Sequence, residues 1–192
     1  MVGWIGLGAL AFGLFLIYDI NEVRWQDRWL HKLFFTGFGL LVLATVGLLL
    51  AQVRQGLPPL AQRAAGVVLT AVFMALLVYT LFRALPFEAT YQEIGGKDKP
   101  LVCQSGVYAL CRHPGVLWFA GFYGSLWLTL GGEALAWAAV IFSLLNVLYV
   151  VFQDRWTFPQ MFADYASYQQ AVPFLIPNWQ SIRRCFATLP RK

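Results

Sequence analysis

The segment Gly106–Pro114 places Tyr108, Arg112 and His113 close together, where a charged stretch gives way to a long apolar one. Burial of an ionisable side chain in hydrocarbon is costly, so a charge at a membrane edge usually faces a partner, a cavity or lipid headgroups. The segment therefore predicts a polar site at a membrane surface.

A second polar group follows residue 153 and consists of Asp154, Tyr165 and Tyr168. If both groups lie on one side of the membrane, they offer a cation for a carboxylate, an imidazole, an acid for an ammonium or sulfonium group, and aromatic faces. Such a set suits a zwitterionic cofactor beside a lipid-accessible cavity.

Each of these residues also has a simpler explanation. Arg112 at a helix start could bind a lipid phosphate, and His113 could make only a local hydrogen bond. The two tyrosines could be interfacial aromatic residues. Asp154 could form a solvated pair with the adjacent Arg155.

The elements that must position these residues are membrane helices. Of the 192 residues, 59% are hydrophobic and only 12% are charged, which indicates a membrane protein. Uncharged stretches of nearly membrane-spanning length predict five transmembrane helices in an all-α fold. The stretches are Met1–Tyr18, Leu33–Val53, Ala64–Phe82, Pro114–Gly132 and Ala134–Gln153. The first lacks a basic segment before it and a small-residue cleavage site after it, so we expect a retained helix and not a signal peptide.

The distribution of basic residues predicts the orientation. With the N-terminus outside, twelve of the fourteen Lys and Arg residues fall on the inner side, and only Arg54 and Arg63 fall outside. We therefore expect an inner-membrane protein with a cytosolic C-terminus. The net charge of +5 then favours contact with anionic membrane lipids, and its dispersal among loops predicts no binding to nucleic acid.

The three cysteines predict neither a disulfide framework nor a metal site. Cys103, Cys111 and Cys185 all fall on the expected cytosolic side, where thiols stay reduced. Their spacing does not match paired zinc ligands, even with His113 nearby.

Two parts are expected along the chain: a three-helix anchor over residues 1–85, and a second part over residues 86–192 with a long cytosolic loop at 86–105. The short Gly131-Gly132 turn predicts an antiparallel hairpin of the last two membrane helices. Tyr108 and Arg112, four residues apart, would share a helical face. Residues 155–171 are expected to form one amphipathic helix against the membrane or the bundle.

At this point the sequence resembles a known family. Gly106-Val-Tyr followed by Arg-His-Pro114, before an apolar hairpin, is similar to the signature of the isoprenylcysteine carboxyl methyltransferases and related phospholipid methyltransferases. The second signature of that family is an acid at the exit of the last helix, then Phe, Tyr-x-x-Tyr and Val-Pro. In this chain, those positions are Asp154, Phe162, Tyr165, Tyr168 and Val172-Pro173. The likeness covers about residues 100–177.

The resemblance implies an integral membrane methyltransferase that uses S-adenosylmethionine. It places Gly106, Val107, Tyr108, His113, Tyr165 and Tyr168 on the cofactor side of the site. It places Arg112 and Asp154 nearest the reaction. The methyl acceptor would be a lipophilic or amphiphilic molecule that approaches from the bilayer, such as an isoprenylcysteine carboxylate or a phospholipid amine.

The chain departs from the family pattern at Gln153-Asp154, where glutamate is usual, and at Val116, where an aromatic residue is common. Two other functions stay open. One is a membrane reductase that uses a nicotinamide cofactor, because sterol reductases resemble this family in their C-terminal half. The other is a non-catalytic relative that binds lipid or a partner protein.

Overall fold

A computed structural model describes residues 1–82 and 99–189 of the chain. Within these two ranges all regular secondary structure is helical. Most of the predicted loop at 86–105, and the predicted boundary between the two parts at residue 85, lie outside the described residues.

Long helices dominate the structure and follow the predicted apolar stretches closely. They are α1 (Val2–Ile20), α2 (Lys32–Val53), α3 (Leu60–Phe82), α6 (Pro114–Leu130) and α7 (Glu133–Phe152). Both α1 and α7 continue at their C-terminal ends into a π-helical turn, η1 (Asn21–Trp25) and η3 (Gln153–Thr157) respectively.

Four helical segments are long and apolar enough to cross a membrane, and they are built on α1, α2, α3 and α7. The remaining predicted span, α6, has 17 residues and ends at Leu130. It stops there because Gly131 and Gly132 have positive φ angles of 70° and 85°, a non-helical backbone conformation that glycine adopts readily. Whether α6 also crosses the membrane stays a prediction.

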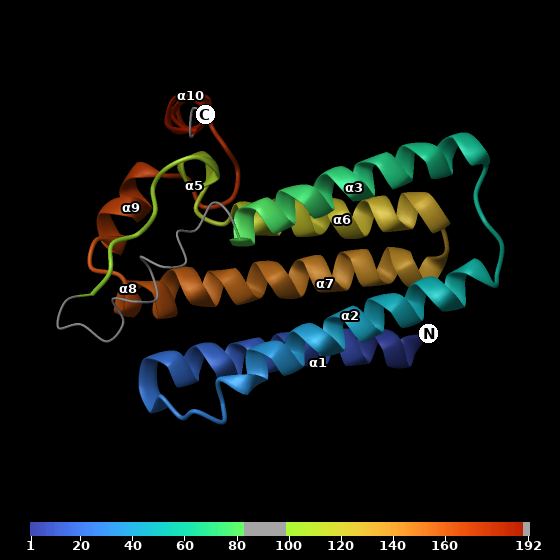
Figure 1. The fold of residues 1–192 in the computed structure, drawn as a ribbon, viewed down its shortest axis with the longest axis horizontal. Helices are drawn as coiled ribbons and strands as arrows, with labels where there is room; N and C mark the ends of the chain where they lie inside the picture. The colour runs from blue at the N-terminus through green and yellow to red at the C-terminus, as the bar shows by residue number, and fades with distance from the viewer. Residues whose placement is uncertain (83–98, 190–192) are drawn as a thin grey trace.

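The long helices form a bundle in which α3 lies along α6, and α1 pairs with α2 on the far side of α7 (Figure 1). The core between them is rich in aromatic residues and includes Phe12 of α1, Tyr123 of α6 and Phe142 of α7. The Tyr123 hydroxyl shares a hydrogen bond of 2.6 Å with Thr45 Oγ1 of α2. The buried hydroxyl pair therefore ties α2 to α6 within an apolar core.

Close contact between α3 and α6 depends on small residues. A Cβ atom at Gly121 would overlap the ring of Phe73 in α3, and one at Gly66 would overlap Thr129 in α6. Thr70 Oγ1 also donates to Ser125 Oγ at 3.0 Å. Gly121 and Ser125 of α6 therefore contact α3, whereas nothing lies within 4 Å of a Cβ built on Gly124.

The prediction of one helix over residues 155–171 is wrong. After η3 the chain forms α8 (Phe158–Met161), breaks, and forms α9 (Tyr165–Ala171). The break occurs where residues 163 and 164 make hydrogen bonds with the loop at residues 100–102. Ala163 N donates to Pro100 O at 3.1 Å, and the Asp164 carboxylate accepts from Val102 N at 2.8 Å. These loop contacts replace helical hydrogen bonds.

The short helices gather at the end of the bundle where α1 and α7 finish (Figure 1). They are α8, α9, α5 (Val107–Leu110) and α10 (Trp179–Thr188). Gly106–Pro114 and the tail after residue 153 therefore meet at one end of the molecule, as the sequence predicts.

Candidate functional site

The chain makes a tight turn at Gly106, shortly before the Arg-His-Pro segment. Gly106 has a φ of 58° and a ψ of −130°, a backbone conformation that residues other than glycine rarely adopt. Its N–H donates to Thr188 Oγ1 of α10 at 2.9 Å. The following helix α5 has only four residues, and Cys111 after it is extended. Because the helix ends before Arg112, Tyr108 and Arg112 do not share a helical face, and that prediction is wrong.

Arg112 and Asp154 form a bidentate ion pair. Arg112 Nε lies 2.7 Å from Asp154 Oδ1, and Nη2 lies 3.0 Å from Oδ2. Both side chains are almost fully buried. This planar, two-bond arrangement is the geometry in which an arginine binds a carboxylate most strongly. Arg112 therefore pairs with Asp154, and among the described residues the exposed Arg155 does not form the alternative pair with this acid.

Arg112 also holds the end of α9. Its Nη1 donates to Gln169 O at 2.9 Å and to Val172 O at 2.7 Å. Its backbone N–H donates to Pro173 O at 2.9 Å. A guanidinium group has five N–H donors, and four side-chain hydrogen bonds join Arg112 to other described residues. One Nη2 donor has no acceptor within the described ranges.

His113 also contacts the Asp154 carboxylate, with Nε2 3.2 Å from Oδ1. Its ring stacks on Phe158 with centroids 5.8 Å apart and meets the edge of Phe174 at 5.2 Å. Burial lowers the pKa of His113 below its ordinary value of 6.5, and the nearby carboxylate opposes that shift only in part. His113 is therefore a neutral imidazole near pH 7.

The tail completes the shell around the carboxylate of Asp154. The Tyr165 hydroxyl donates to Oδ1 at 2.7 Å, and Gln169 Nε2 donates to Oδ2 at 3.1 Å. Burial, and then the adjacent carboxylate, raise the pKa of Tyr165 far above its usual value, so the phenol stays protonated. Asp154 thus has four protein partners for its side chain, which we call the Asp154 cluster: Arg112, His113, Tyr165 and Gln169.

Tyr168 and Tyr108 extend the contacts away from this cluster. The Tyr168 hydroxyl donates to Tyr108 O at 2.7 Å, and the Tyr108 hydroxyl donates to Thr80 O of α3 at 3.2 Å. Tyr165 and Tyr168 are 1% and 2% exposed, so neither is an interfacial aromatic residue. Val107 is also buried. All the residues predicted for the site therefore lie in one region around α5 and α9.

Gln169 was not predicted, although its position carried a signal. It lies four residues after Tyr165 on α9, so both side chains lie on one helical face. Asp164 was also missed. Its carboxylate accepts from Val102 N at 2.8 Å and from Gln104 Nε2 at 2.9 Å, which fixes the loop before Gly106. No pattern in the sequence distinguishes this aspartate from a surface residue.

A second buried acid, Asp19, lies nearby at the end of α1. It accepts from the Tyr149 hydroxyl of α7 at 3.0 Å and, at a longer 3.4 Å, from Thr157 Oγ1 of η3. Gln153 Nε2 in turn donates to the Tyr149 hydroxyl at 2.9 Å. An acid inside an apolar helix is unusual enough to be noticed in a sequence. Its partners depend on how α1 packs against α7.

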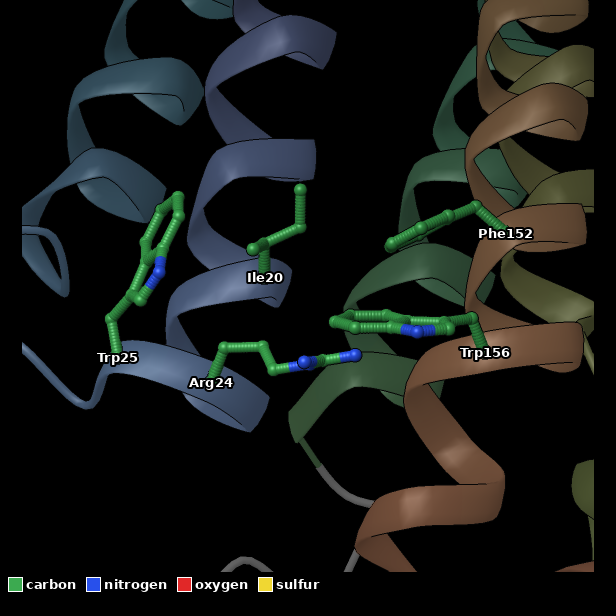
Figure 2. Close-up of a pocket in the computed structure, with 5 residues that line it drawn as sticks. All are labelled: Ile20, Arg24, Trp25, Phe152 and Trp156. Atoms are coloured by element: carbon green, nitrogen blue, oxygen red, sulfur yellow. The ribbon is translucent and has the colours of Figure 1, made fainter.

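A groove lies between the ends of α1 and α7 (Figure 2). Its volume is about 580 Å³, and its lining residues are Ile20, Arg24, Trp25, Phe152 and Trp156. The Arg24 guanidinium extends across the groove to the Trp156 ring, 5.8 Å from its centroid. Since Trp156 and Asp154 belong to the same π-helical turn, the groove borders the element that carries the acid.

The described residues contain no cluster of three or more His, Cys, Asp or Glu side chains arranged to hold a metal ion. Cys111 is completely buried, and burial raises the pKa of its thiol to about 11, so it is not a reactive thiolate.

No protein-family model, no curated protein and no solved structure matches this chain.

Proposed function

We propose that this protein transfers a methyl group from S-adenosylmethionine to a lipophilic or amphiphilic acceptor at one face of a membrane. In this proposal five helices cross the inner membrane, with α6 and α7 as a hairpin, the N-terminus outside and the C-terminus cytosolic. The observation that carries the proposal is the Asp154 cluster. It joins the Gly106–Pro114 segment to the tail beside the ends of the apolar helices.

The chemistry of these side chains fits the proposed cofactor. The Nη2 donor of Arg112 that has no acceptor among the described residues suits a carboxylate, which an arginine binds through charge-assisted hydrogen bonds. The half-buried rings of Phe158 and Phe162, 5.7 Å apart, supply aromatic faces of the kind that attract a sulfonium group. Gly106, Val107, Tyr108, His113, Tyr165 and Tyr168 are proposed to shape the cofactor side of the site.

The bound cofactor would supply an electrophilic methyl group on a positively charged sulfur. Methyl transfer would form a bond between the acceptor's lone pair and the methyl carbon, break the carbon–sulfur bond and release a neutral thioether. A carboxylate acceptor needs no proton transfer. The protein's task is then to position the two molecules and exclude water, and the rigid Arg112–Asp154 pair suits that task.

The groove between α1 and α7 suggests the kind of acceptor. Arg24 can bind a carboxylate or phosphate, while Ile20, Phe152 and Trp156 offer apolar and aromatic surface. An acceptor with one anionic group and an apolar chain matches this lining. We propose the groove as the acceptor's path to the site, and Arg24 as the residue that binds its anionic group.

A second candidate function has one observation in its favour. The members of the Asp154 cluster satisfy one another's hydrogen bonds almost completely, as they would in a purely structural tie. A non-catalytic protein that binds lipid or a partner would need no more than this.

Ligand titration of the detergent-purified protein separates these functions. S-adenosylmethionine and its demethylated product should raise the melting temperature in proportion to binding, whereas NADPH should not. His113→Ala should weaken this response strongly. The matched control is Asp27→Asn, because Asp27 caps the loop after η1 through the Trp29 and Leu30 N–H groups and makes no hydrogen bond to the Asp154 cluster among the described residues. Stabilisation by NADPH alone would favour a reductase, and no response to any of the three compounds would favour the non-catalytic candidate.

A further inference from the structure

The C-terminal helix α10 presents its largest apolar side chains to the outside. Trp179 is 67% exposed and Phe186 is 72% exposed, and Ile176 just before the helix is 82% exposed. Trp179 and Phe186 are seven residues apart, so they lie on the same face two turns from each other. Apolar groups clustered on one exposed face indicate a surface that contacts something else.

The face of α10 that packs against the protein is small and polar. Ser181 and Cys185 are the buried residues of the helix, and Thr188 Oγ1 accepts the Gly106 N–H. The start of the helix is fixed by a capping box in which Asn178 Oδ1 accepts from Ser181 N at 2.8 Å. Because α10 packs through its small residues, its exposed aromatic residues do not belong to the core of this chain.

The direction of α10 is unlike that of the long helices. Figure 1 shows α10 end-on, whereas the long helices run across the view, so its axis is close to perpendicular to theirs. It lies outside the bundle on the α3 side, level with the ends of the long helices. If the long helices cross a membrane, α10 lies parallel to its surface at the depth of the headgroups.

The charges of α10 complement an anionic membrane surface. Arg183 is exposed, and its guanidinium lies over the Trp179 ring at 5.0 Å, so a cation and an aromatic ring are offered together. Arg184 is also exposed and donates to Ala171 O at 2.9 Å. The helix contains no acidic residue. Tryptophan beside basic residues is typical of helices that lie in the interface between headgroups and acyl chains.

We propose that α10 is an interfacial helix that inserts Ile176, Trp179 and Phe186 into the boundary layer of an anionic lipid bilayer. Arg183 binds lipid phosphates above the inserted rings. Since Thr188 holds the N–H of Gly106, lipid docking of α10 also fixes the turn that introduces the Arg-His-Pro segment. The proposal concerns membrane contact alone and stands whether or not the protein transfers methyl groups.

Spin labels on the full-length protein in lipid nanodiscs test the depth of α10. The partly exposed Cys103 is replaced by Ser to lower background labelling, and the buried Cys111 and Cys185 are left in place. A nitroxide at Phe186→Cys should collide often with oxygen and rarely with a water-soluble nickel complex. A nitroxide at Gln180→Cys, an exposed position on the polar side of the same helix, should show the reverse. Equal access of the nickel complex to both positions would overturn the proposal.

Lipid composition tests the charge. Adding phosphatidylglycerol to phosphatidylcholine nanodiscs should raise the shielding of position 186 from the nickel complex. Arg183→Gln should weaken docking about fivefold, the equivalent of one basic side chain at an anionic surface. Lys99→Gln is the control, because Lys99 is an exposed cation outside α10. Strong dipolar coupling between two labels at position 186 would show that a second copy of the chain covers this face, and would also overturn the proposal.

Discussion

Asp19 and Asp154 are two buried acids at the same end of the helix bundle, with exposed fractions of 4% and 6%. Asp154 lies in the π-helical turn η3, and Asp19 accepts a hydrogen bond from Thr157 of the same turn. The charges around the two acids nevertheless differ. Asp154 is paired with the guanidinium of Arg112 and also accepts from Tyr165. Asp19 accepts from the hydroxyls of Tyr149 and Thr157, and no cation pairs with it within the described residues.

The difference shows what each acid does for the fold. The charge of Asp154 is needed because, without it, a guanidinium group would be buried unpaired. Among the described residues no cation is paired with Asp19, so removing its charge leaves no cation unpaired. The turn η3 separates the two environments, since Asp154 faces Arg112 while Thr157, three residues later, faces Asp19. Isosteric substitutions that remove only the charge should therefore have very different costs at the two positions.

The largest effect is expected for Asp154→Asn. This change leaves Arg112 buried without a carboxylate and should lower the free energy of unfolding by about 3–5 kcal/mol. The measurement is unfolding in mixed dodecylmaltoside and dodecyl sulfate micelles, followed by tryptophan fluorescence. Asp164→Asn is the control, because Asp164 is hydrogen-bonded but makes no ion pair with a described residue, and it should cost clearly less. A cost at Asp154 no greater than at Asp164 would show that the ion pair contributes little.

A smaller effect is expected when a hydroxyl of the tail is removed. Tyr165→Phe deletes a bond to a charged acceptor and should cost about 1.5–3 kcal/mol. Tyr168→Phe deletes a bond to the neutral carbonyl of Tyr108 and should cost about 0.5–1.5 kcal/mol. The two tyrosines are equally buried, so their difference isolates the charge of Asp154. The same micelle titration measures both, and equal costs would mean that the acid at 154 is not ionised.

The helices could be predicted from the sequence because uninterrupted apolar length is a local property. The stretch Leu33–Val53 became α2 with one residue of difference at its start. The tail was predicted less well. Its expected single helix breaks at residues 162–164, where Pro100 and Val102 supply contacts that no periodicity in residues 155–171 encodes.

The residues of the candidate site were predicted as a set, but their pairings were not. Arg112 and Asp154 carry opposite charges in segments that the predicted topology places on one side, which is enough to expect an encounter. Which donor of Arg112 meets which oxygen depends on Cys111 being extended and on α9 ending at Ala171. The environment of Asp19 was missed because it depends on α1 packing against α7, a contact between residues more than a hundred positions apart.

The pH dependence of the free energy of unfolding should reveal the protonation of His113. Its pKa in the folded protein lies below the ordinary value of 6.5, so the unfolded chain takes up a proton that the folded chain resists. The contribution of neutral His113 is complete above pH 6.5 and is lost as pH falls from 6.5 toward the folded pKa, with a slope of at most about 1.4 kcal/mol per pH unit. His113→Asn should remove that slope. Unfolding titrations across this pH range would contradict the assignment if the two proteins gave parallel curves.

The smallest effect is expected for Asp19→Asn, and it completes the comparison with Asp154. The asparagine keeps an acceptor for the Tyr149 hydroxyl, and the Thr157 hydroxyl can rotate to accept from the new amide, so the cost should stay within about 1 kcal/mol. Asp19→Leu keeps the branched shape but is larger and apolar, leaves both hydroxyls without this acceptor, and should cost about 1–3 kcal/mol. Both variants remove the charge, and only Asp19→Asn keeps the hydrogen bonding, so unfolding titrations of both separate the effect of polarity from that of charge. If Asp19→Asn were as costly as Asp154→Asn, Asp19 would also be ionised and held by a cation. The two acids would then perform the same structural task on opposite sides of η3.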